Sequence, residues 1–346
     1  MRTATSIDLP ALAITSGTAG SVTADPVTAD PVTAGPVSAD PGTVTTATWS
    51  DWSCLIRVAV TDPAVLTAAV ADVESMMRRV DRAASRFHGE SELSWANVNA
   101  GRPVAVSRTL VNLMTTALEE ADRSGGAVDP TVGRDLVRNG YDRDITLVAD
   151  SAEPVASAPA GRPSWGDVGL DRTAGLLTVP PGATLDLGST AKAQTADWAA
   201  ADLHDRYGCG VLVELGGDLA VAGRGRDWQV LVAEKAGQRG QQVTLSAPLG
   251  LAGLATSSTQ IRRWQRARAE INHIIDPATG AAVTPHWRTV TVAADSATHA
   301  NTCSTAAIVL GGRDPESALS WLRDQGVAAR LVDRFGSIVT IGGWPC

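Results

Sequence analysis

The chain has 346 residues, with 29 Lys and Arg against 37 Asp and Glu, which gives a formal net charge of −8. This acidic balance argues against the basic surface that a nucleic-acid partner requires. No segment is long and apolar enough to span a bilayer, so we expect no transmembrane segment.

The first 46 residues are rich in Ala, Thr, Val, Pro and Asp and repeat Ala-Asp-Pro-Val-Thr with a period of five. A proline at every fifth position forbids a helix, and no aromatic residue is present to seed a core. We therefore predict a disordered tail over residues 1–46 and one folded domain over residues 47–346. The first 17 residues make a poor secretory signal, which favours a cytoplasmic location.

The folded part opens with a predicted strand over residues 54–62, a helix over 64–87 and a second helix after the N-cap candidate Ser107. Residues 183–208 begin as a strand and become a helix near Gly188. Strands follow on both sides of Gly216-Gly217 and over residues 228–234, 250–258, 270–277 and 288–295. Helices over 304–312 and 314–326 and a hairpin over 329–343 close the chain. Because strands and helices mix without a regular βαβ order, the pattern predicts an α+β fold.

Two polar segments in the first half are candidate ligand loops. Glu92 and Asn97 follow the first helix, where they could bind sugar hydroxyls or an adenine edge, or could form a solvated helix end. Farther along, the turn Asp129-Pro130-Thr131 could bring backbone N–H groups close to an anion.

Lys192 is one of only two lysines in a chain that otherwise uses arginine, and it lies in the first turn of a predicted helix. The N-terminus of a helix favours phosphate through its free N–H groups and its dipole. A lysine faces the positive end of that dipole, so an anion or a carboxylate partner explains it better than helix stability does. The spacing is not that of a P-loop, and Gly216-Gly217-Asp218 between two strands is not a dinucleotide fingerprint.

Hydroxyl and amide side chains gather at a predicted strand-to-helix junction near residue 300: Ser296, Thr298, Asn301, Ser304 and Thr305. Oxygen-rich groups of this kind suit a hard cation such as Mg²⁺. The alternative is that these side chains cap the start of a helix, which explains some of the hydroxyls but not their large number.

The segment Ile271–Gly280 reads as a strand that delivers His273 and Asp276 to a tight Pro- and Gly-containing turn. A strand and turn of this kind would place an imidazole and a carboxylate along one side of a binding site. The alternative is a packed histidine followed by an ordinary turn aspartate.

Taken in order, SRF…SELSxxN, GGAVDPTVG, LDLGSTAK, ELGGD, LATSS, HIIDPATG and ANTCSTAAIVLG resemble the ApbE-type FAD:protein FMN transferase family. The resemblance runs from about Trp49 to Gly343. It implies an alpha-beta roll with a mixed, largely antiparallel sheet flanked by helices. It also implies an enzyme that uses Mg²⁺ to cleave the pyrophosphate of FAD, transfers FMN to a Thr or Ser hydroxyl of a target flavoprotein and releases AMP.

The resemblance further implies the residues of the site. The implied FAD-binding residues are Glu92, Asn97, Asp129, Thr131, Asp186, Gly188, Glu214, Gly216, Gly217, Asp218 and Thr256. The implied catalytic residues are Lys192, His273 and Asp276. The implied ligands of Mg²⁺ are a backbone carbonyl near Ser189, the side chain of Asn301 and the hydroxyl of Thr305.

One departure from the family bears on chemistry. Asn301 stands where the family usually has an aspartate that binds magnesium. An amide keeps an oxygen but loses the charge, so metal affinity should fall unless Asp295 or Asp276 compensates. Three functions stay open: an FMN transferase, which we prefer, a metal-dependent FAD pyrophosphatase, and a catalytically silent FAD-binding protein.

Overall fold

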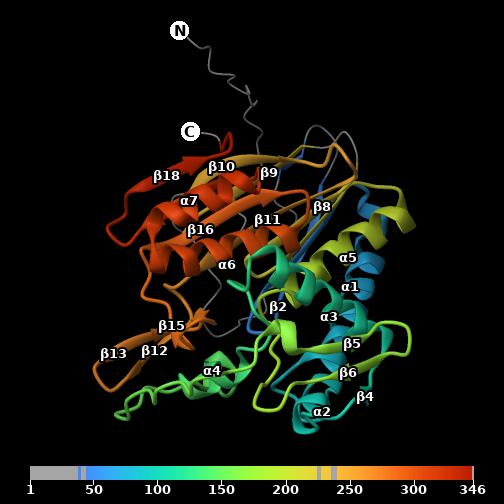
Figure 1. The fold of residues 1–346 in the computed structure, drawn as a ribbon. Coiled ribbons are helices and arrows are strands. Elements are labelled where there is room, and N and C mark those ends of the chain that lie inside the picture. Colours follow the sequence, from blue (N-terminus) through green and yellow to red (C-terminus); the bar gives the residue numbers. More distant parts are fainter. Residues whose placement is uncertain (1–37, 40–43, 224–226, 235–239, 345–346) are drawn as a thin grey trace.

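The computed structural model describes residues 38–39, 44–223, 227–234 and 240–344, and its centre is an eight-stranded sheet (Figure 1). The strand order is β18-β17-β16-β11-β8-β7-β3-β2, and every neighbouring pair is antiparallel. The predicted α+β class is therefore confirmed. The strands are β2 (Thr45–Asp51), β3 (Cys54–Val60), β7 (Val211–Leu215), β8 (Asp218–Ala222), β11 (Leu251–Ser258), β16 (Trp287–Ala294), β17 (Ala328–Asp333) and β18 (Ile338–Ile341).

Helices pack on one face of this sheet: α1 (Leu66–Ala84), α5 (Ala191–Tyr207), α6 (Ala297–Arg313) and α7 (Pro315–Asp324). Helices α5 and α6 bury mainly Ala, Ser and Thr, and these small side chains let the helix axes approach the strands closely. Gly253 on β11 makes the tightest approach, because a Cβ atom there would overlap the backbone of Ser296 and Ala297 at the start of α6.

A three-stranded sheet covers the opposite face. It has the order β1-β9-β10 and consists of β1 (Ser38–Ala39), β9 (Asp227–Val232) and β10 (Gln241–Ser246). Trp228 is fully buried in the cluster that joins this small sheet to Leu212 and Leu254 of the large one. Alternating apolar residues on both strands of the β9–β10 pair give each of them one buried face.

A second lobe packs beside the helices (Figure 1). Ser107 caps α3 as predicted, since its hydroxyl accepts the N–H of Leu110 at 3.3 Å. The lobe contains α2 (Glu92–Val98), α3 (Arg108–Arg123), α4 (Gly133–Arg138), the sheet of β4 (Val104–Ala105), β6 (Leu176–Thr178) and β5 (Gly169–Asp171), and the 3₁₀ turns Ile145–Leu147 and Trp165–Asp167. A further 3₁₀ turn, Pro63–Val65, leads into α1. Two separate hairpins complete the described structure. One pairs β12 (Arg263–Arg266) with β13 (Ala269–Asn272), and the other pairs β14 (Ile275–Asp276) with β15 (Ala281–Ala282).

The single strand predicted over residues 270–277 is wrong, because β13 ends at Asn272 and β14 begins at Ile275 in a different hairpin. The side chain of Asn272 accepts the N–H of Ile274 at 3.0 Å and donates to the carbonyl of Val283 at 2.9 Å. These two bonds bend the chain, so His273 lies at a bend between strands.

Three other local predictions are also wrong. Residues 183–190 form no strand, because the neighbouring turn uses their backbone: Gly133 N–H donates to Thr184 O at 2.9 Å, and Asp186 N–H donates to Pro130 O at 2.8 Å. Helix α6 begins at Ala297 and not at 304, so Asn301 lies inside the helix. Residues 92–98, predicted as a loop, form helix α2, which Ser91 caps.

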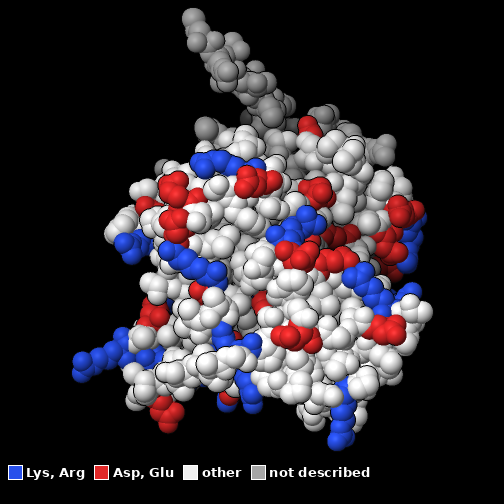
Figure 2. Space-filling model, in the orientation of Figure 1, with Lys and Arg blue, Asp and Glu red and all other residues white. Residues whose placement is uncertain are grey.

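Residues 45 and 46 of the predicted tail begin β2, and residues 38 and 39 pair with β9. Residues 1–37 and 40–43 of that tail lie outside the described residues. Among the described residues, no helix has both the length and the apolar character needed to cross a bilayer. The face drawn in Figure 2 carries basic and acidic side chains interspersed.

Candidate functional site

A cavity of about 670 Å³ lies where the C-terminal end of α1, the start of α5, strands β8 and β11, helix α6 and the His273 bend meet. A cavity of this size is typical of small-molecule and cofactor sites. Its lining includes Trp52, Arg86, Phe87, Asp129, Tyr141, Asp144, Asp186, Gly188, Ser189, Lys192, Gly217, Asp218, Thr256, Ser257, Arg262, His273, Asn301 and Thr305.

Asp218 is the centre of the polar wall of this cavity. Its Oδ2 atom accepts Lys192 Nζ at 2.6 Å, and its Oδ1 atom accepts Asn301 Nδ2 at 2.6 Å. Asp218 is 1% exposed, so the carboxylate is almost removed from water and these two donors replace its hydration. The carboxylate partner expected for Lys192 from the helix dipole is therefore Asp218.

The β7–β8 turn explains how Asp218 reaches this position. Gly216 has φ = +66°, a conformation that glycine adopts without strain. A Cβ atom on Gly217 would lie 2.9 Å from Thr256 O, so the absence of a side chain lets the turn lie against β11. Asp218 is the first residue of β8 and faces α5 and α6 from there.

A second buried carboxylate, Asp197, fixes the N-terminus of α6. It accepts the N–H groups of Ala297 at 2.7 Å and Thr298 at 2.9 Å, and also the Thr298 hydroxyl at 2.7 Å. Burial raises the pKa of Asp197 from 3.8 to about 6, and the negative charge of Asp218 adds to this rise. Asp197 therefore positions the helix that carries Asn301.

The same stretch of α6 presents hydroxyl groups to the cavity. Thr305 lies one turn after Asn301, and its Oγ1 atom lies 2.8 Å from Ser257 Oγ on β11, which in turn lies 2.8 Å from Ser304 Oγ. Thr256 Oγ1 lies 2.7 Å from Thr291 Oγ1 in the neighbouring strand. The cation ligands implied for α6 thus share one wall with Asp218.

Elsewhere in the lining, the carboxylate of Asp186 pairs with Arg86 and accepts the N–H of Gly188 at 2.8 Å. The Arg86 guanidinium lies 4.3 Å from the ring centroid of Phe87 and 4.8 Å from that of Tyr141, which are cation–π distances. This wall offers flat apolar surface together with charge.

The Asp129 loop also contributes to the lining. Asp129 Oδ1 accepts both the N–H and the hydroxyl of Thr131, at 2.8 and 2.7 Å, and Oδ2 accepts the N–H of Trp165 at 3.2 Å. Burial raises the pKa of Asp129, while these bonds and the charge of Arg162 oppose the rise. Asp129 lines the cavity, and Thr131 faces away from it into a second cavity.

The structure separates His273 from Asp276. His273 lines the cavity, but Asp276 does not, because its carboxylate is held by the guanidinium of Arg313, with one bond of 3.0 Å, and by the N–H of Ala278 at 2.9 Å. Asp276 therefore fixes a turn and does not reach the space that His273 faces.

Besides Thr131, four more of the predicted binding residues lie outside the lining of this cavity: Glu92, Asn97, Glu214 and Gly216. Glu92 accepts the N–H of Ser107 at 2.5 Å, and Asn97 bonds to the backbone of Leu185 at 2.7 and 3.0 Å. Glu214 is fully buried, with Arg57 3.5 Å away. These residues connect elements that carry the walls.

Sequence reasoning missed the aromatic and arginine side chains of the cavity, notably Trp52, Arg86, Tyr141 and Arg262. Arg86 and Phe87 stand in the SRF motif, so a signal was present for them. Arg262 lies just before the β12–β13 hairpin, which no apolar pattern predicted.

Residues 42–342 match the ApbE family, and the chain therefore belongs to that family. It is 28% identical over 288 residues to the FAD:protein FMN transferase of Klebsiella pneumoniae, and the match covers 81% of each chain. It is 29% identical over 277 residues to the protein of the same name in Treponema pallidum, with 75% of this chain and 76% of the other covered.

The fold is similar to that of the ApbE protein of Thermotoga maritima, with a TM-score of 0.75, 23% identity, and 86% of this chain and 97% of the other covered. The apo flavinyl transferase ApbE of Pseudomonas stutzeri is similar with a TM-score of 0.70, 21% identity, and 87% and 96% covered. The alpha-beta roll implied by the sequence is thus confirmed.

The raised pKa of Asp197 gives a pH-dependent prediction. The folded state holds this proton more tightly than the unfolded state, so the group stabilises the fold most below pH 4 and loses that contribution as pH rises through about 6. Asp197→Asn removes the titration. On going from pH 4 to pH 7, wild type should therefore lose up to about 3 kcal/mol relative to the variant. Urea unfolding of both proteins across this range measures the difference, and parallel pH profiles would contradict the assignment.

Proposed function

We propose that this protein transfers the FMN part of FAD to a Thr or Ser hydroxyl of a target flavoprotein and releases AMP, with Mg²⁺ as the metal. Membership of the ApbE family and relatives named FAD:protein FMN transferase support flavin transfer. The observation that carries the proposal is the Lys192–Asp218–Asn301 cluster on the wall of a cavity large enough for a dinucleotide.

In this proposal the cluster binds the pyrophosphate. Lys192 lies in the first turn of α5, where the helix dipole and the backbone N–H groups also favour an anion. Its side chain is 20% exposed, so Nζ can reach a phosphate while Asp218 holds it in place. Charge neutralisation and positioning are the main contributions a protein makes to such a reaction.

The flavin and adenine ends need flat surfaces. Phe87 and Tyr141 supply aromatic faces, and Arg86 stacks on both of them. Trp52 lines the same cavity. We assign this aromatic wall to the dinucleotide as a whole, because either ring system can stack on such faces.

The donors on the α6 wall fit a hard cation. Asn301 is 7% exposed, and its Oδ1 atom is buried without a hydrogen-bond partner among the described residues. Asp218, the hydroxyl of Thr305 and the carbonyl near Ser189 complete a set of oxygen donors, the kind that Mg²⁺ prefers. A bound Mg²⁺ would neutralise charge on the phosphates. The described residues include no cluster of three or more His, Cys, Asp or Glu side chains, so substrate oxygens would provide much of the coordination.

Asp218 supplies the carboxylate next to Asn301 in this proposal. The sequence led us to expect that Asp276 or Asp295 supplies this carboxylate, and that expectation is wrong. Asp276 is bound by Arg313, and Asp295 has a 75% exposed side chain bonded to His299 at 3.0 Å. Neither lines the cavity.

His273 is the proposed general base. Transfer forms a bond between the acceptor oxygen and the FMN phosphorus and breaks the bridging P–O bond to AMP, and the acceptor proton must leave. His273 lines the cavity, whereas Asp276 is excluded from it. Asp218 is less available for this role, because two donors already bind its oxygens.

The direct test mixes purified protein, FAD, Mg²⁺ and a flavoprotein target and looks for a covalently fluorescent target band. Transfer predicts that band together with AMP, and both should depend on target and metal. AMP without any target would instead identify the pyrophosphatase. Tight FAD binding with no AMP at any Mg²⁺ concentration would identify the silent binding protein and contradict the transferase.

His273→Gln should lower kcat for FMN transfer by about 10²- to 10⁴-fold, the usual contribution of a general base. The affinity for FAD should change little, because Lys192 and the aromatic wall remain. Turnover kinetics and FAD titration measure the two quantities separately. A kcat within about threefold of wild type would show that His273 does not remove the proton.

Asn301→Asp should raise cation affinity about tenfold or more, since it adds a charged oxygen at the site. Without a cation, the introduced carboxylate and Asp218 would repel each other, so the variant should melt at a lower temperature than wild type. Mn²⁺ titration followed by electron paramagnetic resonance, together with thermal melts, measures both effects. Thr305→Val serves as the comparison and should weaken Mn²⁺ binding. Equal Mn²⁺ affinity in all three proteins would contradict this site.

A further inference from the structure

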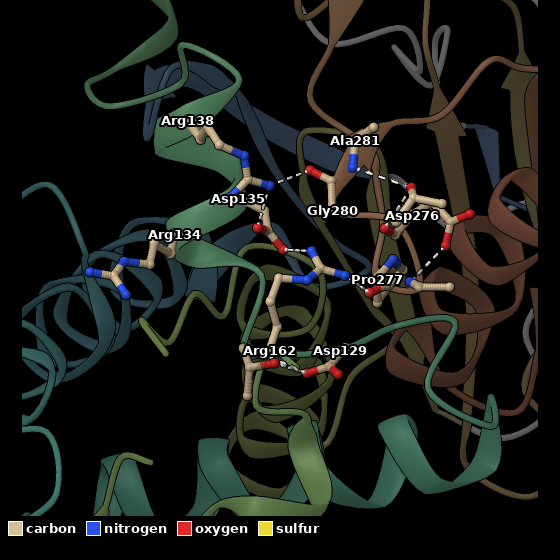
Figure 3. A network of polar contacts seen from close by, with 12 residues as sticks. Asp129, Arg134, Asp135, Arg138, Arg162, Asp276, Pro277, Gly280 and Ala281 are labelled. Atoms are coloured by element: carbon tan, nitrogen blue, oxygen red, sulfur yellow. Dashed lines mark hydrogen bonds and ion pairs between the residues drawn. The ribbon is translucent and has the colours of Figure 1, made fainter. Parts of the chain in front are cut away.

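The turn Asp276–Gly280, directly after the His273 bend, is held in place by a network of arginines (Figure 3). Arg138 of α4 donates to Gly280 O at 2.8 Å, and Asn139 donates to the same oxygen at 3.0 Å. Arg162, from the irregular segment before Trp165, donates to Pro277 O. Three separate hydrogen bonds thus fix the backbone of one turn.

Asp135 connects these arginines to helix α4. Its Oδ1 atom accepts Arg138 at 2.5 Å, and its Oδ2 atom accepts Arg162 at 2.6 Å. The side chain of Asp135 is 8% exposed, and those of Arg138 and Arg162 are 14% and 18% exposed. Ion pairs with this little solvent contact are weakly screened, so the guanidinium positions are well defined.

Gly280 shows how closely Arg162 lies against the turn. A Cβ atom on Gly280 would overlap Arg162 Nη1 and would lie 2.7 Å from Arg138 Nη2. Gly280 also has φ = +68°. Glycine is therefore required here both for the turn and for the guanidinium packed on it.

Arg162 stands behind a wall of the main cavity. A second cavity of about 450 Å³ is lined by Arg162 and Asp135. Asp129, Val132 and Pro277 line both cavities, so they form the partition between them. By binding Pro277 O, Arg162 holds that partition from the side opposite the proposed flavin site.

We infer that Arg162 is a positioning residue: it sets the partition at Pro277, and with it the His273 bend, from within the second cavity. The inference rests on the proposed function for its effect on FAD. Arg162 does not line the main cavity, so it acts through the turn and not by contact with the dinucleotide. Because the second cavity has room for a small cation, a lost guanidinium can be replaced from solution.

The test compares Arg162→Ala with Arg134→Ala. Arg134 lies on α4, points away from the network (Figure 3) and donates to one backbone carbonyl, that of Gly182, at 3.0 Å. Both variants lose one guanidinium that binds a backbone carbonyl. Only Arg162→Ala loses a contact to the partition, the one to Pro277 O. Calorimetric titration with FAD and steady-state kinetics are run with added guanidinium chloride or with sodium chloride at the same ionic strength.

Arg162→Ala should raise the Kd for FAD or lower kcat by about tenfold or more, since small misplacements in a site are costly. Low millimolar guanidinium chloride should restore most of the loss, and sodium chloride should restore none. Arg134→Ala should match wild type under every condition. If wild type binds FAD, then wild-type behaviour of Arg162→Ala, or a loss that guanidinium does not restore, would overturn the inference.

If Arg162→Ala does not fold, Arg162→Lys applies the same test, because lysine keeps the charge but cannot bridge Asp135 and Pro277 O together. Hydrogen exchange of residues 274–282 separates this inference from the proposed function. Faster exchange in the Arg162 variant, but not in Arg134→Ala, supports the positioning role. This holds even if wild type binds no FAD, because the absence of FAD binding would reject only the proposed function. Equal exchange in both variants would overturn the positioning role.

Discussion

The carboxylate of Asp218 accepts Lys192 Nζ and Asn301 Nδ2 at 2.6 Å each while it is almost closed to solvent. A buried charge with one partner removed is strongly destabilising, so the β7–β8 turn and the starts of α5 and α6 are bound to one another through this group. The glycine turn that brings β8 against β11 and the Asp197 cap on α6 both serve this geometry. The polar wall of the cavity follows from it.

The charges on this wall are already balanced by one another. The carboxylate beside Asn301 is already paired with Lys192, and Asn301 itself is neutral, with a buried oxygen that no described residue binds. In the proposed function, a phosphate beside Lys192 and a cation beside Asp218 and Asn301 would each offset the charge that the other adds. Binding of one would therefore favour binding of the other.

Much of the fold could be predicted from the sequence, because its strands and long helices have clear periods and caps. The Gly216-Gly217 strand pair, the Ser107 cap and the closing hairpin rest on local patterns that tertiary contacts do not override. The dipole argument at Lys192 also predicted an anion or a carboxylate partner, and Asp218 is such a carboxylate. Local patterns did not reveal the bend at His273, since its cause is the side chain of Asn272 bonding to Ile274 and Val283.

The lining of the cavity was harder to predict, because side-chain contacts and not local sequence patterns decide which residues face it. Nothing in the Asp-Pro-Ala-Thr-Gly pattern tells which side of the turn faces the cavity, and Arg313 takes Asp276 to the far side. Glu92 and Asn97 have side chains suited to ligands but bond to the backbone of Ser107 and Leu185. Arg86, Tyr141 and Arg262 come from segments distant in sequence that only the folded chain brings together.

The most direct test of the central claim is calorimetric titration of the wild-type protein with FAD and with riboflavin, each with and without Mg²⁺. If Asp218, Lys192 and Asn301 form a diphosphate and cation site, FAD should bind more tightly than riboflavin, and Mg²⁺ should strengthen binding of FAD alone. Equal affinities for the two flavins, unaffected by Mg²⁺, would contradict the account.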